Sequence, residues 1–188
     1  MTTFDVGARF LERSRYYLGV EYPAKIRAAM RAMPAERVWW RANPSSNSAA
    51  NLVLHLAGNV RQWIVSGVGG AADVRQRDAE FAASAASPGS AADASVEALI
   101  AVLDAACVDA VGVLERIGVG ALGEMRLIQG REATVFAAVY HVVEHFSGHT
   151  GQIILIAKES APGVVRFYDD AGGLARPLFL PDGGTDVG

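Results

Sequence analysis

The stretch that decides the fold of this chain is YHVVEHFSGHTGQII, which runs from Tyr140 to Ile154. It contains three of the four histidines, His141, His145 and His149, and each lies four residues from the next. On an α-helix, residues four apart lie on one face, with Cβ atoms about 5–6 Å apart. Two imidazoles placed in this way can bind one metal ion through ring nitrogens. The stretch therefore predicts a helix that presents a pair of metal ligands.

Helix geometry limits which pair this is. A rise of about 1.5 Å per residue puts His141 and His149 roughly 12 Å apart along the axis, too far to share one ion. The pair is therefore His141 with His145 or His145 with His149, and the spacing leaves both open. His145 belongs to either pair.

The fourth histidine, His55, lies in a separate helical pattern. It shares a predicted face with Leu52, Leu56 and Trp63. A lone histidine on an apolar face is usually a hydrogen-bonded core residue, because a buried polar group needs a partner. The histidines at 141–149 favour the other interpretation, in which His55 lies opposite them as a third ligand.

Composition bounds the class of protein. The 188 residues suit one domain, and 51% of them are hydrophobic, so a sizeable core is possible. Much of the apolar content is alanine, which favours helix over sheet. The formal net charge is −3, from 17 basic and 20 acidic residues. Such a balance predicts neither a nucleic-acid-binding surface nor attraction to an anionic membrane.

The single cysteine, Cys107, cannot form a disulfide within the chain. We expect it to pack as a small apolar residue, so any metal site must use nitrogen and oxygen ligands. Residues 1–5 lack the charged and apolar regions of a signal peptide. No apolar run reaches the roughly 18 residues of a membrane span. These features predict a cytoplasmic protein.

Periodicity and capping residues predict four main helices. The first is kinked or split at Pro23, and the second begins at the capping residues Asn47-Ser48. Residues 119–130 look extended, and Pro162-Gly163 ends the last helix. The predicted helices cover residues 5–33, 47–67, 96–117 and 132–159. We therefore expect a helical domain over 1–160 and a short irregular or hairpin tail over 161–188, packed on the domain or trailing from it.

The connection over residues 68–94 is long and rich in Gly, Ala and Ser. It contains a charged segment, Arg75-Gln76-Arg77-Asp78-Ala79-Glu80-Phe81. Long connections inside compact domains are often functional. The segment is therefore either the mouth of an active site or a solvated helical turn.

Three strings together resemble the DinB-like family of four-helix-bundle metalloproteins. They are Asn47-Ser48 followed by His55-Leu56-Ala57-Gly58-Asn59, the charged segment 75–81, and His145-Phe146-Ser147-Gly148-His149-Thr150-Gly151-Gln152-Ile153. The resemblance covers about residues 8–158 and is strongest to a subfamily described only as a domain of unknown function. It implies an all-α fold, a four-helix bundle of up-down-down-up type. It leaves the tail from Gly163 unexplained.

The resemblance also implies a ligand set. It places the metal ligands on His55, His145 and His149, and His141 at a position that is polar or supports another imidazole. Metal-bound histidines usually donate their second ring proton to a partner. Gln152 and Asn59, each near one turn beyond a ligand, are candidates for that role or for holding a bound water. Two further candidates, Arg75 and Arg77, would bind a carboxylate of a thiol cofactor.

Three imidazoles leave a divalent ion with an open position, as in catalytic zinc sites. Zinc or nickel is the expected metal, and manganese, iron and cobalt also accept imidazole. The resemblance implies a thiol-dependent S-transferase or isomerase that uses a low-molecular-weight thiol such as bacillithiol or mycothiol. One alternative is a hydrolase with a metal-activated water, and another is a non-catalytic metal-binding stress-response protein. The expected partners are a small-molecule substrate and a second copy of the chain in a homodimer.

Overall fold

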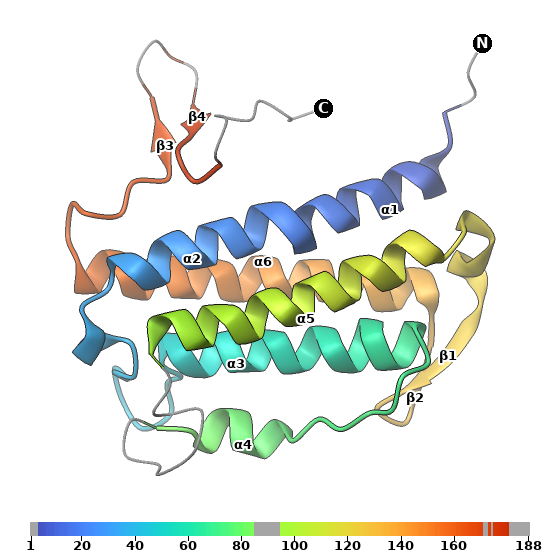
Figure 1. Ribbon diagram of the computed structural model, residues 1–188, viewed down its shortest axis with the longest axis horizontal. Coiled ribbons are helices and arrows are strands. Elements are labelled where there is room, and N and C mark those ends of the chain that lie inside the picture. The colour runs from blue at the N-terminus through green and yellow to red at the C-terminus, as the bar shows by residue number, and fades with distance from the viewer. Residues whose placement is uncertain (1–3, 85–94, 171–172, 174, 181–188) are drawn as a thin grey trace.

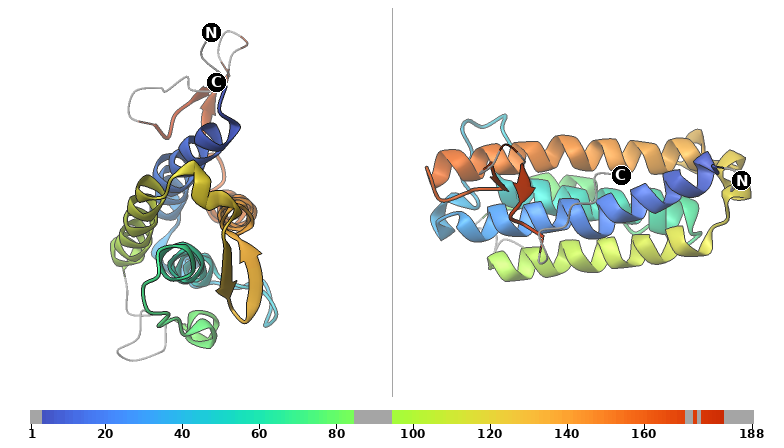
Figure 2. Two further views of the ribbon diagram at one scale, coloured as in Figure 1. Left: turned by 90° about the vertical axis from the view of Figure 1, so that its right-hand side faces the viewer. Right: turned by 90° about the horizontal axis from the view of Figure 1, so that it is seen from above.

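A computed structural model describes residues 4–84, 95–170, 173 and 175–180 of the chain. Over these residues the protein is mostly helical, with two small antiparallel hairpins. The long helices lie side by side, and one hairpin lies at an end of them while the other lies beside α2 (Figures 1 and 2). The expected helical class is therefore confirmed for the main body of the molecule.

The first helical segment is continuous from Val6 to Ala32. It consists of α1 (Val6–Tyr16), a π-helical stretch η1 (Tyr17–Glu21) and α2 (Tyr22–Ala32). Asp5 caps its start by accepting a hydrogen bond from the Ala8 amide at 3.0 Å. Pro23 neither ends nor splits the helix, because it follows η1, whose wider turn accommodates the missing N–H. A short 3₁₀ turn, η2 (Ala35–Arg37), follows.

The second segment begins where its capping residues predicted. Ser48 caps α3 (Ala49–Val60), with its hydroxyl accepting from the Asn51 amide at 3.1 Å. The helix continues as a π-helical stretch, η3 (Arg61–Val68). Inside the predicted connection lies a short helix, α4 (Arg77–Ala82), which confirms a helical turn in the charged segment. Residues 85–94 of that connection lie outside the described residues.

The third segment, α5 (Val96–Arg116), agrees with its prediction and is capped by Ser95. After it come a 3₁₀ turn, η5 (Val119–Gly123), and a hairpin of β1 (Met125–Ile128) with β2 (Arg131–Thr134). The predicted start of the last helix near residue 132 was wrong, because Glu132 pairs with Leu127 in this hairpin. The last helix is α6 (Val135–Ser160), capped by Thr134. Gln129 and Gly130 form the turn with φ of 55° and 72°, a geometry that favours a tight hairpin.

Contacts between side chains set the directions of the helices. Arg15 reaches the Leu114 carbonyl, Arg27 pairs with Asp104, and Arg31 pairs with Glu97, so the first segment runs antiparallel to α5. Phe10 meets Phe136 and Tyr22 meets Phe146, so the first segment runs parallel to α6. By the same test α3 runs antiparallel to α6, since the residue pairs are His55 with His149 and Trp63 with His141. This direction brings histidines that are distant in sequence to the same level.

The tail contains a second hairpin, of β3 (Tyr168–Asp169) and β4 (Arg176–Pro177). The ammonium of Lys25 on α2 lies 4.9 Å from the centroid of the Phe179 ring and 5.8 Å from that of Tyr168. These cation–π contacts hold the described part of the tail against α2. The prediction for the tail also included residues 181–188, which lie outside the described residues. In the part of the chain that the structure describes, no helix combines the length and the apolar character that crossing a membrane requires.

Cys107 is buried on α5, as expected for a cysteine that packs as a small apolar residue. Burial raises the pKa of its thiol to about 12. At a pH equal to the ordinary thiol pKa of 9.0, an exposed cysteine is about half ionised, whereas the Cys107 thiol of the folded protein stays neutral. We therefore expect iodoacetamide to label Cys107 slowly in the native protein and rapidly in urea. Mass spectrometry of timed samples measures this. Equal labelling rates in the two conditions would contradict the buried position.

Candidate metal centre

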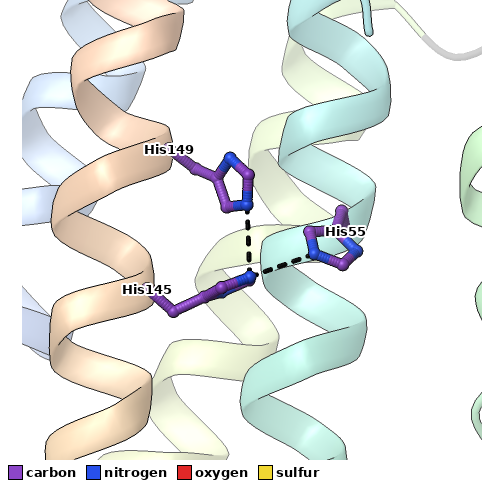
Figure 3. A group of neighbouring side chains, drawn as sticks. All are labelled: His55, His145 and His149. Atoms are coloured by element: carbon purple, nitrogen blue, oxygen red, sulfur yellow. Dashed lines mark hydrogen bonds between the residues drawn. The ribbon is translucent and has the colours of Figure 1, made fainter.

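Two helices supply three imidazoles to one point. His55 projects from α3, and His145 and His149 project from successive turns of α6 (Figure 3). Nε2 of His145 lies 3.1 Å from Nε2 of His55 and 3.2 Å from Nε2 of His149. Because α3 and α6 are neighbours, the rings of His145 and His149 on α6 both face the ring of His55 on α3.

The donor set fits a divalent metal ion. One ligand atom from each of the three histidines lies within 4.8 Å of the other two. Bonds of roughly 2.0–2.1 Å in a tetrahedral site set ligand nitrogens about 3.3–3.4 Å apart, a few tenths of an ångström more than two of the separations here. The third separation, between the ligand nitrogens of His55 and His149, is no more than 4.8 Å, so binding an ion requires the rings to rotate. Among the residues that the structure describes, these three form the group with metal-binding geometry.

The rings of His55 and His149 each form a hydrogen bond through Nδ1, the nitrogen that faces away from the centre. Nδ1 of His55 lies 2.9 Å from Oε2 of Glu80, and Nδ1 of His149 lies 2.7 Å from Oε1 of Gln152. Arg75 grips Glu80 with two bonds of 2.7 Å, from Nε to Oε1 and from Nη2 to Oε2. Both partners are acceptors, so they direct the Nε2 atoms of His55 and His149 toward the centre.

Burial and neighbouring charges shift the titration of these groups. Burial alone would raise the pKa of Glu80, but hydrogen bonds from Arg75 and His55 outweigh it and hold that pKa below its ordinary value. Burial, with smaller contributions from the nearby His149 and His55, lowers the pKa of His145 to about 3. Burial also lowers the pKa of His149. The imidazoles of His145 and His149 are therefore neutral at physiological pH, and the neutral form is the one that binds a metal.

His141 does not converge with the other three. Its ring packs on Trp63 with centroids 4.4 Å apart, and its centroid lies 5.6 Å from that of His145. Burial lowers the pKa of His141, against a smaller opposing effect of Glu144. Of the two pairs that helix geometry allowed, the structure brings His145 and His149 to His55.

The other predicted residues lie in different places. Gln152 bonds to His149, whereas Arg75 lies against His55 and pairs with Glu80, a carboxylate of the chain itself. Arg77 lies over the ring of Phe81, with its guanidinium 4.9 Å from the centroid. Asn59 is buried on α3, and its Oδ1 has no hydrogen-bond partner among the described residues.

Glu80 was not among the predicted site residues. It lies within the charged segment that the sequence analysis singled out, and its side chain is 10% exposed. The signal that could have found it is its position in the charged segment, five residues after Arg75. Its contact with His55 spans 25 residues and depends on how α4 packs on α3, which local spacing does not reveal.

Gly58 lets Glu80 approach α3. A Cβ at position 58 would overlap Oε1 of Glu80 and lie 2.8 Å from its Cδ. We expect Gly58→Ala to destabilise the protein by about 1–3 kcal/mol, because Arg75 and His55 hold the carboxylate in place. Urea denaturation measures this.

Gly112→Ala on α5 is the matched control for Gly58→Ala. Its nearest neighbour would be Nη1 of Arg116 at 3.3 Å, the end of a flexible side chain. Alanine is the better helix former, so this control should be neutral or stabilise by up to about 1 kcal/mol. Equal effects at positions 58 and 112 would contradict a close approach of Glu80.

The fold and the site define a mostly helical protein with a group of three histidines that could bind a metal ion. A family described as "Protein of unknown function (DUF1572)" matches residues 5–163. That match spans most of the chain, and the protein belongs to this family. Comparison with curated proteins gave no match.

Proposed function

We propose that this protein is a divalent-metal-dependent enzyme of DinB-like type, with His55, His145 and His149 as the metal ligands. The observation that carries the proposal is the convergence of their three Nε2 atoms from two antiparallel helices. The up-down-down-up directions of the long helices support assignment to the DinB-like bundle. The family match, which ends at residue 163, supports a domain over 1–160 with a tail over 161–188.

The number of ligands favours a catalytic site over a structural one. Structural zinc sites usually have four protein ligands, whereas catalytic sites have three and one exchangeable position. Among the described residues, the candidate group has three members. Glu80 is the nearest carboxylate in the described contacts, and it bonds Nδ1 of His55, the ring nitrogen that does not face His145. It therefore orients a ligand and does not complete the site.

Zinc or nickel is the metal that we propose, because the ligand set is entirely imidazole. Such an ion would act as a Lewis acid that lowers the pKa of a thiol or of water. The reaction that we propose is S-transfer or a related isomerisation with a low-molecular-weight thiol. The resemblance to DinB-like proteins supports this chemistry. In this role α3 and α6 hold the imidazoles, and Glu80 and Gln152 fix their orientation.

The test has two stages. First, untagged protein is purified and its bound metal is measured by elemental analysis, with about one ion per chain expected. Second, the metal-loaded protein is incubated with an electrophile and a panel of thiols, and free thiol is titrated. Metal-dependent thiol loss supports the proposal. Metal-dependent product release without thiol indicates the hydrolase instead, and no stoichiometric metal contradicts both.

A further inference from the structure

We propose that Glu80, held by Arg75, is a positioning residue that fixes the tautomer of His55 and leaves its Nε2 free to bind the metal. This inference rests on the proposed function as far as the metal is concerned. The tautomer itself is a property of the metal-free chain. The two parts can therefore be tested separately.

The ion pair with Arg75 keeps the Glu80 carboxylate ionised, so the carboxylate can only accept hydrogen bonds. Arg75 binds both oxygens of Glu80 through Nε and Nη2, which is the fork geometry of a charged pair. The side chains are 4% and 10% exposed. A buried carboxylate in such a pair is ionised and has no proton to donate. Any group that hydrogen-bonds to it must supply the proton.

This assigns the proton of His55. Its Nδ1 lies 2.9 Å from Oε2 of Glu80, so Nδ1 carries the hydrogen and Nε2 is left with a free lone pair. Nη2 of Arg75 also lies 3.1 Å from this Nδ1. In this tautomer that approach is not a hydrogen bond, because both nitrogens donate to the same oxygen. Oε2 accepts from Nη2 of Arg75 at 2.7 Å.

Hydrogen-bond partners also indicate which nitrogen carries the proton in His149 and in His145. His149 donates from Nδ1 to the amide oxygen of Gln152, so its Nε2 is also free. In the metal-free chain the remaining proton between the rings then belongs to Nε2 of His145, which lies 3.1 Å and 3.2 Å from the two free nitrogens. This proton must leave Nε2 before that atom can bind a metal. Nδ1 of His145 is consequently bare, which agrees with its having no hydrogen-bond partner in the described part of the chain.

The three ligands therefore differ in the charge of the group that lies against Nδ1. His55 has an ionised carboxylate, His149 has a neutral amide, and His145 has no partner among described residues. A carboxylate raises the basicity of a ligating imidazole more than an amide does. We infer that loss of Glu80 weakens the metal site more than loss of Gln152.

The position of Glu80 is set by the main chain of α4. Asn51 donates to the Glu80 carbonyl at 2.9 Å, and Arg41 donates to the Phe81 carbonyl at 2.8 Å. The Phe81 ring also packs on His55, with centroids 4.7 Å apart. These contacts attach α4 to α3 and to Arg41 in the segment before it. Glu80 is thus placed by its helix as well as by Arg75.

The first test is zinc affinity, measured by competition with a chromophoric chelator. Glu80→Gln removes the charge, and we expect affinity about 10–100-fold weaker than that of the wild type. Gln152→Ala should lose less. Glu97→Gln is the matched control, because Glu97 forms a similar two-bond pair with Arg31 at the surface, and its affinity should be unchanged. Wild-type affinity in Glu80→Gln would overturn the inference.

A second variant guards against misfolding. Glu80→Gln leaves Arg75 buried without its charge partner, which destabilises proteins. The double variant Arg75→Met/Glu80→Met removes both charges with side chains of similar length. It should keep the native circular dichroism and lose zinc affinity about 10–100-fold. A native-like double variant with wild-type affinity would also overturn the inference.

The third test needs no metal. Long-range ¹H–¹⁵N correlation spectra of the metal-free protein report which ring nitrogen of each histidine carries the proton. We expect His55 protonated at Nδ1 in the wild type and a mixture of tautomers in the double variant. Protonation of His55 at Nε2, or an unchanged spectrum in the double variant, would refute the role of Glu80. Failure of the wild type to bind zinc or nickel would refute the proposed function and leave this result standing.

Discussion

His145→Ala is expected to lower zinc affinity by about 100–1000-fold. Structural zinc sites with four ligands bind with about 10–16 kcal/mol, so one ligand contributes about 3 kcal/mol. His145 is the ring nearest to both others, and its loss leaves His55 and His149 without their shared neighbour. Chelator competition and elemental analysis measure the change.

Metal binding should also stabilise the wild type and not this variant. Zinc in excess of its dissociation constant by about 100-fold stabilises a binding-competent fold by about 2.7 kcal/mol. Thermal unfolding with and without zinc therefore gives a second readout of the same site. The stabilisation should be absent from His145→Ala at the same zinc concentration.

His141→Ala is the matched control for His145→Ala. His141 lies on the same helix, one turn away, but its ring packs against Trp63 and does not join the converging nitrogens. Zinc affinity should therefore stay near that of the wild type. If His141→Ala loses metal as completely as His145→Ala, the ion lies between those two residues and the proposed ligand set is incorrect.

Phe146→Ala should destabilise the protein by about 3–5 kcal/mol, the usual range for removing a fully buried phenylalanine. Phe146 has an exposed fraction of 0% and packs toward Tyr22 on α2, with ring centroids 6.4 Å apart. In a chain of this size the melting temperature should fall by roughly 6–20 °C. Urea denaturation gives the free energy of unfolding directly.

Phe136→Ala is the control on the same helix. Phe136 is 47% exposed and packs on Phe10 with tilted rings and centroids 4.5 Å apart, so its replacement should cost about 1 kcal/mol. A similar free-energy loss in both variants would mean that α6 does not bury the face of Phe146.

Much of the helical fold follows from local sequence. Ser48, Ser95 and Thr134 each begin a long helix, because a hydroxyl before an apolar periodic run satisfies a free amide. The start at Ser48 was predicted from this chemistry. The third was placed too early, because Glu132 pairs across a hairpin whose turn at Gln129-Gly130 depends on backbone conformation.

The candidate site was predictable in part. Spacing alone showed that His145 belongs to any site on its helix, and it excluded a joint role for His141 and His149. It did not choose between the two remaining pairs. That choice came from the DinB-like resemblance, and the structure brings together the same three rings. Glu80 was missed because its contact with His55 depends on the packing of α4.

The chain by itself determined that a helix would present imidazoles on one stripe, because side chains four residues apart lie on one face whatever surrounds them. Tertiary structure alone decided which two of the three meet His55. The register of α3 against α6 places His55 at the level of His145 and His149, and it places Trp63 against His141. A shift of one turn along α6 would exchange these roles without changing a residue.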